Sequence, residues 1–428
     1  MAKNKNLVYD VEETPKFSFS ILLAIQHVFA MFGATILVPL LVNKLAGQVI
    51  LTVPVALLTS GIGTLIYILC TRGKSPVYLG SSFAFIPPMV AAAALGGKGP
   101  VFTGIMCVGL AYVLVAIIIK ICGKKWIDKI LPPLVVGPMI MIIGLGLAPT
   151  AISYIGIDGN EAINWANVVV AIVTFLVAAL VALKAKGFFK VIPFLIGIVA
   201  GYIVAICFGM VDFKVVLEAA WFSLPEVSIP FVHYQLSFKA VLTILPVILV
   251  TIPEHIGDHT VLGTIIDRDL LKEPGLDKTL LGDGLATFAA GLLGGPANTT
   301  YGENTSVVGM TKVASVRVLK IAALISICFA FLGKMSAILS TIPNPVLGGA
   351  CLLLYGFIAV NGLRVIVENK IDFSKTRNVI ITSAMLVLGL GGATLGISTG
   401  NLSISISGMS LAAIVGILLN SFLPKKVD

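Results

Sequence analysis

Apolar runs long enough to cross a membrane follow one another along nearly the whole chain. A spanning helix needs about 20 mostly apolar residues. Of the 428 residues, 58% are hydrophobic and only 11% are charged, whereas soluble domains carry about 25% charged residues. No aqueous fold covers this much apolar surface, so the sequence predicts an integral membrane protein. Twelve continuous candidate spans are 17–42, 49–70, 100–122, 130–150, 166–184, 190–208, 240–262, 279–295, 316–334, 344–363, 378–397 and 405–423.

The net charge of +9 comes from basic residues scattered between the apolar runs rather than gathered in a patch. This distribution is typical of loops that set membrane topology, and it argues against binding to nucleic acid. The polar N-terminal tail has no short apolar core of a signal peptide, so we expect the first span to be retained.

Two further segments, 76–96 and 298–312, are only moderately apolar and rich in Gly, Ser, Thr and Asn. If both cross the membrane, the chain has fourteen crossings with both termini inside. Five of the 29 Lys and Arg residues then lie outside, which leaves 24 inside, as the positive-inside rule requires. Without these crossings the bias weakens. The five outside residues are Lys44, Lys98, Lys214, Lys239 and Lys334.

An internal repeat accompanies the fourteen crossings. "LPPLVVG" at 131–137 recurs as "IPNPVLG" at 342–348, and "IQHVFAMFG" at 25–33 has an echo in "PEHIGDHTVLG" at 253–263. Seven is an odd number, so two units of seven crossings must be inverted relative to each other. This arrangement is typical of secondary transporters, whose substrate site lies at the midplane where interrupted helices meet.

The broken segments each begin with a pattern that favours extended backbone and end with a helical one. Pro, Gly and β-branched residues disfavour a helix in the first half of each. Extended backbone cannot face lipid, so we expect the two stretches to pair with each other inside the protein. Each then leads into a half-helix whose N-terminal amides, near Phe83 and Gly302, suit ligand oxygens. The alternative is a pair of helices kinked by Gly.

Three carboxylates lie within apolar spans, where acids are costly and usually functional: Glu254, Asp258 and Glu303. Glu254 and Asp258 are four residues apart and share one helix face. Two acids so close in low dielectric resist double ionisation, which makes one of them a candidate proton carrier. A zinc site from His255, Asp258 and His259 is a weaker alternative, because no HExxH motif is present. Capping of a span end is a further alternative for Asp258 or His259.

Other polar residues in the spans have plainer interpretations. Gln26 and His27 on the first span are interpreted as a hydrogen-bonded pair in the core rather than as a functional site. Asp283 follows the expected start of a span and is interpreted as a helix N-terminal stabiliser.

Taken together, these motifs resemble the nucleobase–ascorbate transporter family, and within it the bacterial uracil permeases. The resemblance is carried by "QHVFAMFGATILVP", "YLGSSFAFI", "EHIGD", "NTTYGEN" and "PVLGGACLLLYG", and covers nearly the whole chain. It implies an all-α polytopic fold of fourteen segments in two inverted seven-segment repeats, with two strand-plus-half-helix segments at the midplane. It implies a core domain, 17–122 and 240–334, and a gate domain, 125–235 and 335–424.

The resemblance also implies a function. It predicts a proton-coupled symporter, not an enzyme, that imports uracil across the cell membrane by alternating access. The expected partners are uracil, protons, the lipid bilayer and a second copy bound through the gate domains, with no metal or cofactor. The implied substrate-binding residues are Glu254, Glu303, Phe83, Gly302, Tyr301 and Tyr355, and the implied proton-coupling residues are Asp258, Glu254 and His27.

Three other functions compete with this interpretation. An anion exchanger of the same architecture would not place Glu254 and Glu303 beside its half-helices. A membrane enzyme would need a catalytic set that the spans do not supply. A purine or xanthine permease would share fold and coupling. Tyr301-Gly302-Glu303-Asn304 stands where such permeases typically carry a Gln-Asn-Asn-Gly-like run, which favours a pyrimidine.

Overall fold

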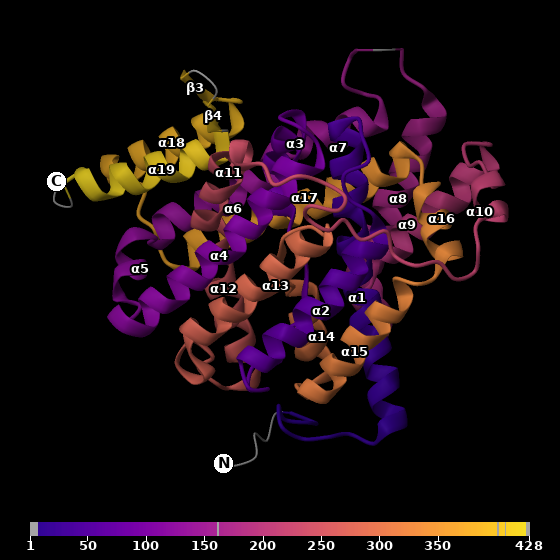
Figure 1. Ribbon diagram of the computed structural model, residues 1–428, viewed down its shortest axis with the longest axis horizontal. Helices are drawn as coiled ribbons and strands as arrows, with labels where there is room; N and C mark the ends of the chain where they lie inside the picture. The colour runs from indigo at the N-terminus through magenta and orange to yellow at the C-terminus, as the bar shows by residue number, and fades with distance from the viewer. Residues whose placement is uncertain (1–6, 161, 400–401, 407, 425–428) are drawn as a thin grey trace.

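The computed structural model describes residues 7–160, 162–399, 402–406 and 408–424, and within them the fold is mostly helical (Figure 1). The principal helices are α1 (Phe17–Ala46), α2 (Val53–Cys70), α3 (Ile86–Ala94), α4 (Lys98–Cys122), α6 (Pro133–Gly146), α7 (Ala148–Ile155), α8 (Trp165–Lys184), α9 (Pro193–Cys207), α12 (Ile248–Ile266), α13 (Leu276–Leu293), α14 (Gly302–Thr311), α15 (Val316–Phe329), α17 (Asn344–Glu368), α18 (Thr376–Leu390) and α19 (Gly408–Phe422). Shorter helices are α5 (Lys125–Ile130), α10 (Lys214–Glu218), α11 (Val241–Ile244) and α16 (Gly333–Ser340).

Seven helical stretches in the described ranges are long and apolar enough to cross a membrane. They are Phe17–Ala46, Val53–Cys70, Lys98–Cys122, Pro133–Ile155, Trp165–Lys184, Phe238–Ile266 and Asn344–Glu368. Shorter apolar helices lie between and after them, and large apolar side chains such as Leu176 and Leu180 on α8 are exposed. The chain is therefore a multi-pass membrane protein. Fourteen crossings and an inverted repeat stay predictions.

The helices pack in two sets that are interleaved along the chain. In the first set, α13 packs against α2 and α4, and α15 packs against α1 and α2. In the second, α17 packs against α6, α7 and α8, while α18 packs against α19 and α6. Small residues allow the closest approaches. A Cβ at Gly109 of α4, for example, would lie 2.5 Å from the Phe288 backbone nitrogen of α13.

Two short strands confirm the predicted pairing of the broken segments. β1 (Leu79–Ser81) pairs antiparallel with β2 (Asn298–Thr300), with Gly80 opposite Thr299. Each strand then passes directly into a short helix, α3 through a single 3₁₀ turn (Phe83–Phe85) and α14 at Gly302. The half-helix arrangement expected from the sequence is therefore present, and the alternative of two continuous kinked helices is wrong.

The predicted span 378–397 is wrong at its C-terminal end. Helix α18 stops at Leu390, and β3 (Leu395–Thr399) and β4 (Leu402–Ile406) form a hairpin before α19. Gly391 and Gly392 follow the helix, and the φ of Gly392 is +70°, a conformation that only glycine adopts readily. Beyond them the sequence alternates Ile and Ser, a strand pattern whose apolar content resembles that of a span.

Candidate functional site

The strands β1 and β2 are buried, and side chains of neighbouring helices bond their backbone. On the β1 side, Ser60 Oγ of α2 donates to the Leu79 carbonyl at 2.6 Å, and the Leu79 amide donates to Thr64 Oγ1 at 2.9 Å. On the β2 side, Thr287 Oγ1 of α13 donates to the Asn298 carbonyl at 3.2 Å. Polar side chains of α2 and α13 therefore take the place of further strands, as backbone at membrane depth requires.

Tyr301 fixes the passage from β2 into α14. Its hydroxyl accepts from Thr35 Oγ1 at 3.1 Å and donates to the Ser81 carbonyl at 3.0 Å. Its ring lies on Gly80, where a Cβ would meet the ring at 2.3 Å. The side chain is buried, so its polar end is directed into the protein, towards α1 and β1. The resemblance places Tyr301 beside the substrate, and this role stays a prediction.

The start of α14 is open. No side chain caps this helix, Gly302 is exposed, and a Cβ there would meet no atom within 4 Å. Glu303 occupies the first turn and is half-buried. The free amides and the positive end of the helix dipole therefore stand beside a carboxylate.

The other two acids lie on α12 as predicted. Asp258 Oδ2 accepts from Thr300 Oγ1 of β2 at 2.5 Å, which joins α12 to the strand crossing. Glu254 lies one turn earlier, and its Oε2 atom is buried without a hydrogen-bond partner in the described part of the chain. The charges of Asp258, Glu303 and Asp283 all act on Glu254. The three acids singled out in the sequence, Glu254, Asp258 and Glu303, are called the carboxyl cluster below.

An aromatic pair adjoins α3, the half-helix that follows β1. The rings of Phe83 and Tyr355 meet edge to face, with centroids 6.4 Å apart and planes at 77°. Phe83 begins the turn that leads into α3, and Tyr355 lies on α17. This contact therefore joins the two sets of helices.

His27 is bonded to Asn304 rather than to Gln26. Asn304 Nδ2 of α14 donates to both Nδ1 and the backbone carbonyl of His27, each at 3.1 Å. His27 is 2% exposed and has its accepting nitrogen turned to α14. The bond holds α1 against the half-helix that carries Glu303. Its predicted role in proton coupling stays a prediction.

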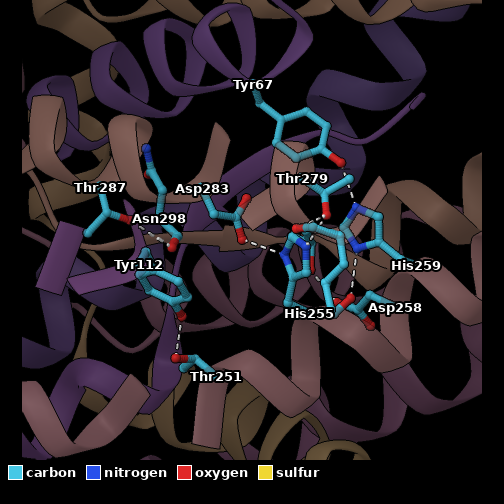
Figure 2. Close-up of polar contacts among 12 residues, drawn as sticks. Tyr67, Tyr112, Thr251, His255, Asp258, His259, Thr279, Asp283, Thr287 and Asn298 are labelled. Atoms are coloured by element: carbon cyan, nitrogen blue, oxygen red, sulfur yellow. Dashed lines mark hydrogen bonds and ion pairs between the residues drawn. The ribbon is translucent and has the colours of Figure 1, made fainter. Parts of the chain in front are cut away.

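The interpretation of Asp283 as a helix N-terminal stabiliser is wrong. Helix α13 begins at Leu276, so Asp283 lies in its third turn and is 1% exposed. Its Oδ2 atom lies 2.7 Å from His255 Nδ1, and His255 Nε2 lies 2.9 Å from Thr279 Oγ1 (Figure 2). The apolar run begins later than the helix does, so hydropathy alone places the start of the helix too late. Pro274-Gly275 is the sequence signal for the earlier start.

A second buried contact involves His259. Its Nε2 atom lies 2.5 Å from the Tyr67 hydroxyl of α2, and its ring stacks on His255 with centroids 4.0 Å apart (Figure 2). His259 also lines a cavity of about 460 Å³ that runs along α12 to the α12–α13 loop. The spacing of the two histidines is visible in the sequence, but their partners are not, because those partners come from other helices.

Comparison with known proteins gives a consistent result. Residues 19–397 match the Permease family. The uracil permease of Bacillus caldolyticus is 48% identical over 97% of this chain and 95% of its own, and that of Bacillus subtilis (strain 168) is 47% identical over 94% and 92%. The transmembrane domain of the cyanobacterium bicarbonate transporter BicA has a similar fold, with a TM-score of 0.65 and 14% identity over 96% of this chain and 99% of that one. These names indicate a transporter rather than an enzyme.

Proposed function

The chain belongs to the Permease family, and from that premise we propose that it imports uracil across the cell membrane in symport with protons. The observation that carries the proposal is the carboxyl cluster of Glu254, Asp258 and Glu303 beside the open start of α14. Two relatives that cover nearly all of the chain are named uracil permeases, which supports uracil as the substrate.

The chemistry of uracil matches this cluster. Its flat ring carries two N–H donors and two C=O acceptors. Glu254 offers a buried oxygen that accepts no hydrogen bond in the described chain, and Glu303 lies beside it. The amide at Gly302 is a donor for a carbonyl oxygen, and Phe83 offers an aromatic face for the ring. Tyr355 closes the site from α17, since its ring contacts Phe83.

Proton coupling is proposed for Asp258 and Glu254, with His27 as the next candidate. One turn separates the two acids on α12, and like charges at that spacing disfavour double ionisation. A proton held by one member leaves the other free to accept from uracil. Loss of that proton restores the repulsion, weakens the site and releases the base.

Alternating access is proposed as a movement of a core domain, 17–122 and 240–334, against a gate domain, 125–235 and 335–424. The two sets of helices support this division, because α1, α2, α4, α13 and α15 pack together and α6, α8, α17, α18 and α19 pack together. The proposal includes fourteen crossings in two inverted halves, cytoplasmic termini and a homodimer formed through the gate domains.

Calorimetry with uracil tests the site. Glu254→Ala and Glu303→Ala each remove an acceptor, and a hydrogen bond to a charged group contributes about 1.5–3 kcal/mol. We expect uracil affinity to fall roughly ten- to a hundredfold in each variant. Glu368→Ala is the matched control, because Glu368 is exposed and pairs with Arg364 four residues away on the same helix. Wild-type affinity in either site variant would remove that residue from the site.

A purine permease is the alternative function, and calorimetry also distinguishes it from a uracil permease. Uracil is titrated into protein that already contains xanthine at an equal concentration. Under the proposal, xanthine leaves the uracil isotherm unchanged. Displacement of uracil by xanthine would assign the site to purines instead.

A further inference from the structure

The contact between His255 and Asp283 lies outside the carboxyl cluster and has no role in the function proposed so far. Both side chains are buried, in the middle of α12 and α13 respectively. His255 follows Glu254 on α12, and its contact with Asp283 joins α12 to α13. Its hydrogen bonds allow the protons to be assigned one by one.

Thr279 indicates which nitrogen of His255 carries a proton. Its hydroxyl has one proton to give and lies 3.2 Å from the Leu276 carbonyl, which only accepts, and 2.9 Å from His255 Nε2. When the hydroxyl donates to the carbonyl, its oxygen accepts from His255 Nε2. In this arrangement Nε2 carries hydrogen, and a neutral imidazole then has an acceptor at Nδ1.

The contact between His255 Nδ1 and Asp283 Oδ2, 2.7 Å long, then needs a second proton. Either Asp283 is protonated and donates to Nδ1, or His255 is an imidazolium facing a carboxylate. Asp283 Oδ1 is buried and has no hydrogen-bond partner among the described residues. An ionised carboxylate with one oxygen unpaired in the interior is costly, which favours the neutral acid.

The neighbouring histidine is interpreted as neutral, because His259 is fully buried and burial disfavours a charged ring. Its Nδ1 atom lies 2.7 Å from the His255 backbone carbonyl, which only accepts, so Nδ1 carries hydrogen and Nε2 of the neutral ring is the acceptor. The Tyr67 hydroxyl then donates to that Nε2 and accepts from Ser75 Oγ at 2.9 Å. His255 therefore has an uncharged ring beside it, with centroids 4.0 Å apart.

We propose that Asp283 and His255 together hold one exchangeable proton, at a site separate from Glu254 and Asp258, and that this proton takes part in coupled transport. The second half of the proposal rests on the proton symport proposed above. The proton lies between Asp283 Oδ2 and His255 Nδ1. The cavity along α12 is lined in part by His259, whose ring centroid lies 4.0 Å from that of His255.

Asp283 acts electrostatically on titratable side chains of three helices. These are Tyr67 from α2, Tyr112 from α4, and Glu254, Asp258 and His259 from α12. Beyond them, Cys70 acts on Tyr67, and Glu303 of α14 acts on Glu254 and Asp258. Asp283 acts electrostatically on both Glu254 and Asp258. A change in the charge of the pair is therefore felt directly at the proposed uracil site.

Nitrogen NMR tests the position of the proton without any transport assay. The full chain is labelled with ¹⁵N-histidine in lipid nanodiscs, and the four histidines give few enough signals to assign His255 by comparison with His255→Gln. We expect hydrogen on Nε2 and a shared proton at Nδ1. A bare Nε2 with an ordinary Nδ1–H would mean that Thr279 donates and the pair holds no second proton, which overturns the proposal.

Proteoliposomes test the coupling. Asp283→Asn keeps a donor towards His255 Nδ1 but has no proton to release. We expect it to retain exchange of internal for external uracil and to lose accumulation driven by an imposed pH gradient. Accumulation at the wild-type level would show that the pair takes no part in coupling.

Tyr112→Phe is the matched control. The Tyr112 hydroxyl donates to Thr251 Oγ1, so this variant also removes a buried hydrogen bond to α12, but no proton store. We expect it to retain gradient-driven accumulation. If it lost accumulation as Asp283→Asn does, the effect would be one of packing and the proposal would be wrong. A wild-type protein that bound no uracil would contradict the proposed function, while the NMR result would still locate the proton.

Discussion

At the scale of single residues, the buried acids could be predicted from the sequence, whereas their hydrogen-bond partners could not. Glu254, Asp258 and Glu303 stand out in sequence because a charge inside an apolar run is costly and is usually kept for a function. Asp283 is interpreted from sequence as a helix N-terminal stabiliser, yet its Oδ2 atom pairs with His255 of another helix. Whether a buried acid is paired depends on which helices meet, and no local pattern encodes that.

Asp258 provides the sharpest test at this scale. Asp258→Asn keeps an oxygen that can accept from Thr300 Oγ1, so the bond to β2 survives while the charge is lost. Under the proposed coupling, the variant resembles the protonated state. We expect it to bind uracil with less dependence on pH and to exchange uracil across vesicles.

The measurement for Asp258→Asn is paired uptake with and without an imposed pH gradient. We expect the gradient to have no effect on the accumulated uracil. Should the variant still concentrate uracil in response to the gradient, Asp258 is not the coupling residue, and Glu254 or His27 becomes the next candidate.

At the scale of elements, the strand crossing could be predicted because two independent constraints agree. Gly, Pro and β-branched residues disfavour helix in both broken segments, and the bilayer forbids unpaired extended backbone. Only pairing of the two segments satisfies both. The hairpin β3–β4 could not be predicted from hydropathy, because the apolar content of its alternating Ile and Ser residues is high enough to be counted as part of a membrane span.

Gly80 is the residue on which the crossing depends. A Cβ there would lie 2.3 Å from Cε2 and Cζ of Tyr301, a ring held by hydrogen bonds at its hydroxyl. We expect Gly80→Ala to cost about 1–3 kcal/mol of stability, because a shift of the ring would strain or break the hydrogen bonds of the Tyr301 hydroxyl. Thermal unfolding in detergent measures the loss, and we expect weaker uracil binding with it.

Gly396→Ala is the control for that experiment. Gly396 also lies in a strand, β3, but a Cβ there would meet no atom within 4 Å. We expect its melting temperature and uracil affinity to match the wild type. Equal behaviour of the two variants would show that Tyr301 does not hold the crossing in place.

At the scale of the whole molecule, loops far apart in sequence gather at the two ends of the helices. At one end the N-terminal segment contacts the α14–α15 link, where the Val8 amide donates to the Lys312 carbonyl at 2.8 Å. Arg268 pairs with Asp10 at 2.9 Å, and Lys74 pairs with Glu273 at 2.5 Å. The bond and charge of Lys74 lower the pKa of Glu273 from its ordinary value.

The other end is built from different loops. Lys98 Nζ donates to Ser228 Oγ at 3.4 Å, and Lys334 Nζ donates to the Val216 carbonyl at 2.6 Å. All these contacts join loops that the charge distribution assigns to the same side of the membrane. This agreement supports the proposed topology, in which the end that carries Lys74, Arg268 and Lys312 faces the cytoplasm.

Cysteine labelling decides whether the two broken segments cross. Asn160 and Ser374 are exposed loop residues, and with fourteen crossings they lie outside and inside respectively. If neither broken segment crossed, every loop between the segment containing β1 and the segment containing β2 would change sides, so Asn160 would move inside while Ser374 stayed. The six native cysteines are replaced first, since Cys122, Cys207 and Cys328 are exposed. We expect an impermeant thiol reagent added to intact cells to label Asn160→Cys and to leave Ser374→Cys unlabelled until the membrane is opened. Protection of both positions in intact cells, followed by labelling of both after lysis, would contradict the fourteen-crossing topology, because it would place Asn160 on the cytoplasmic side.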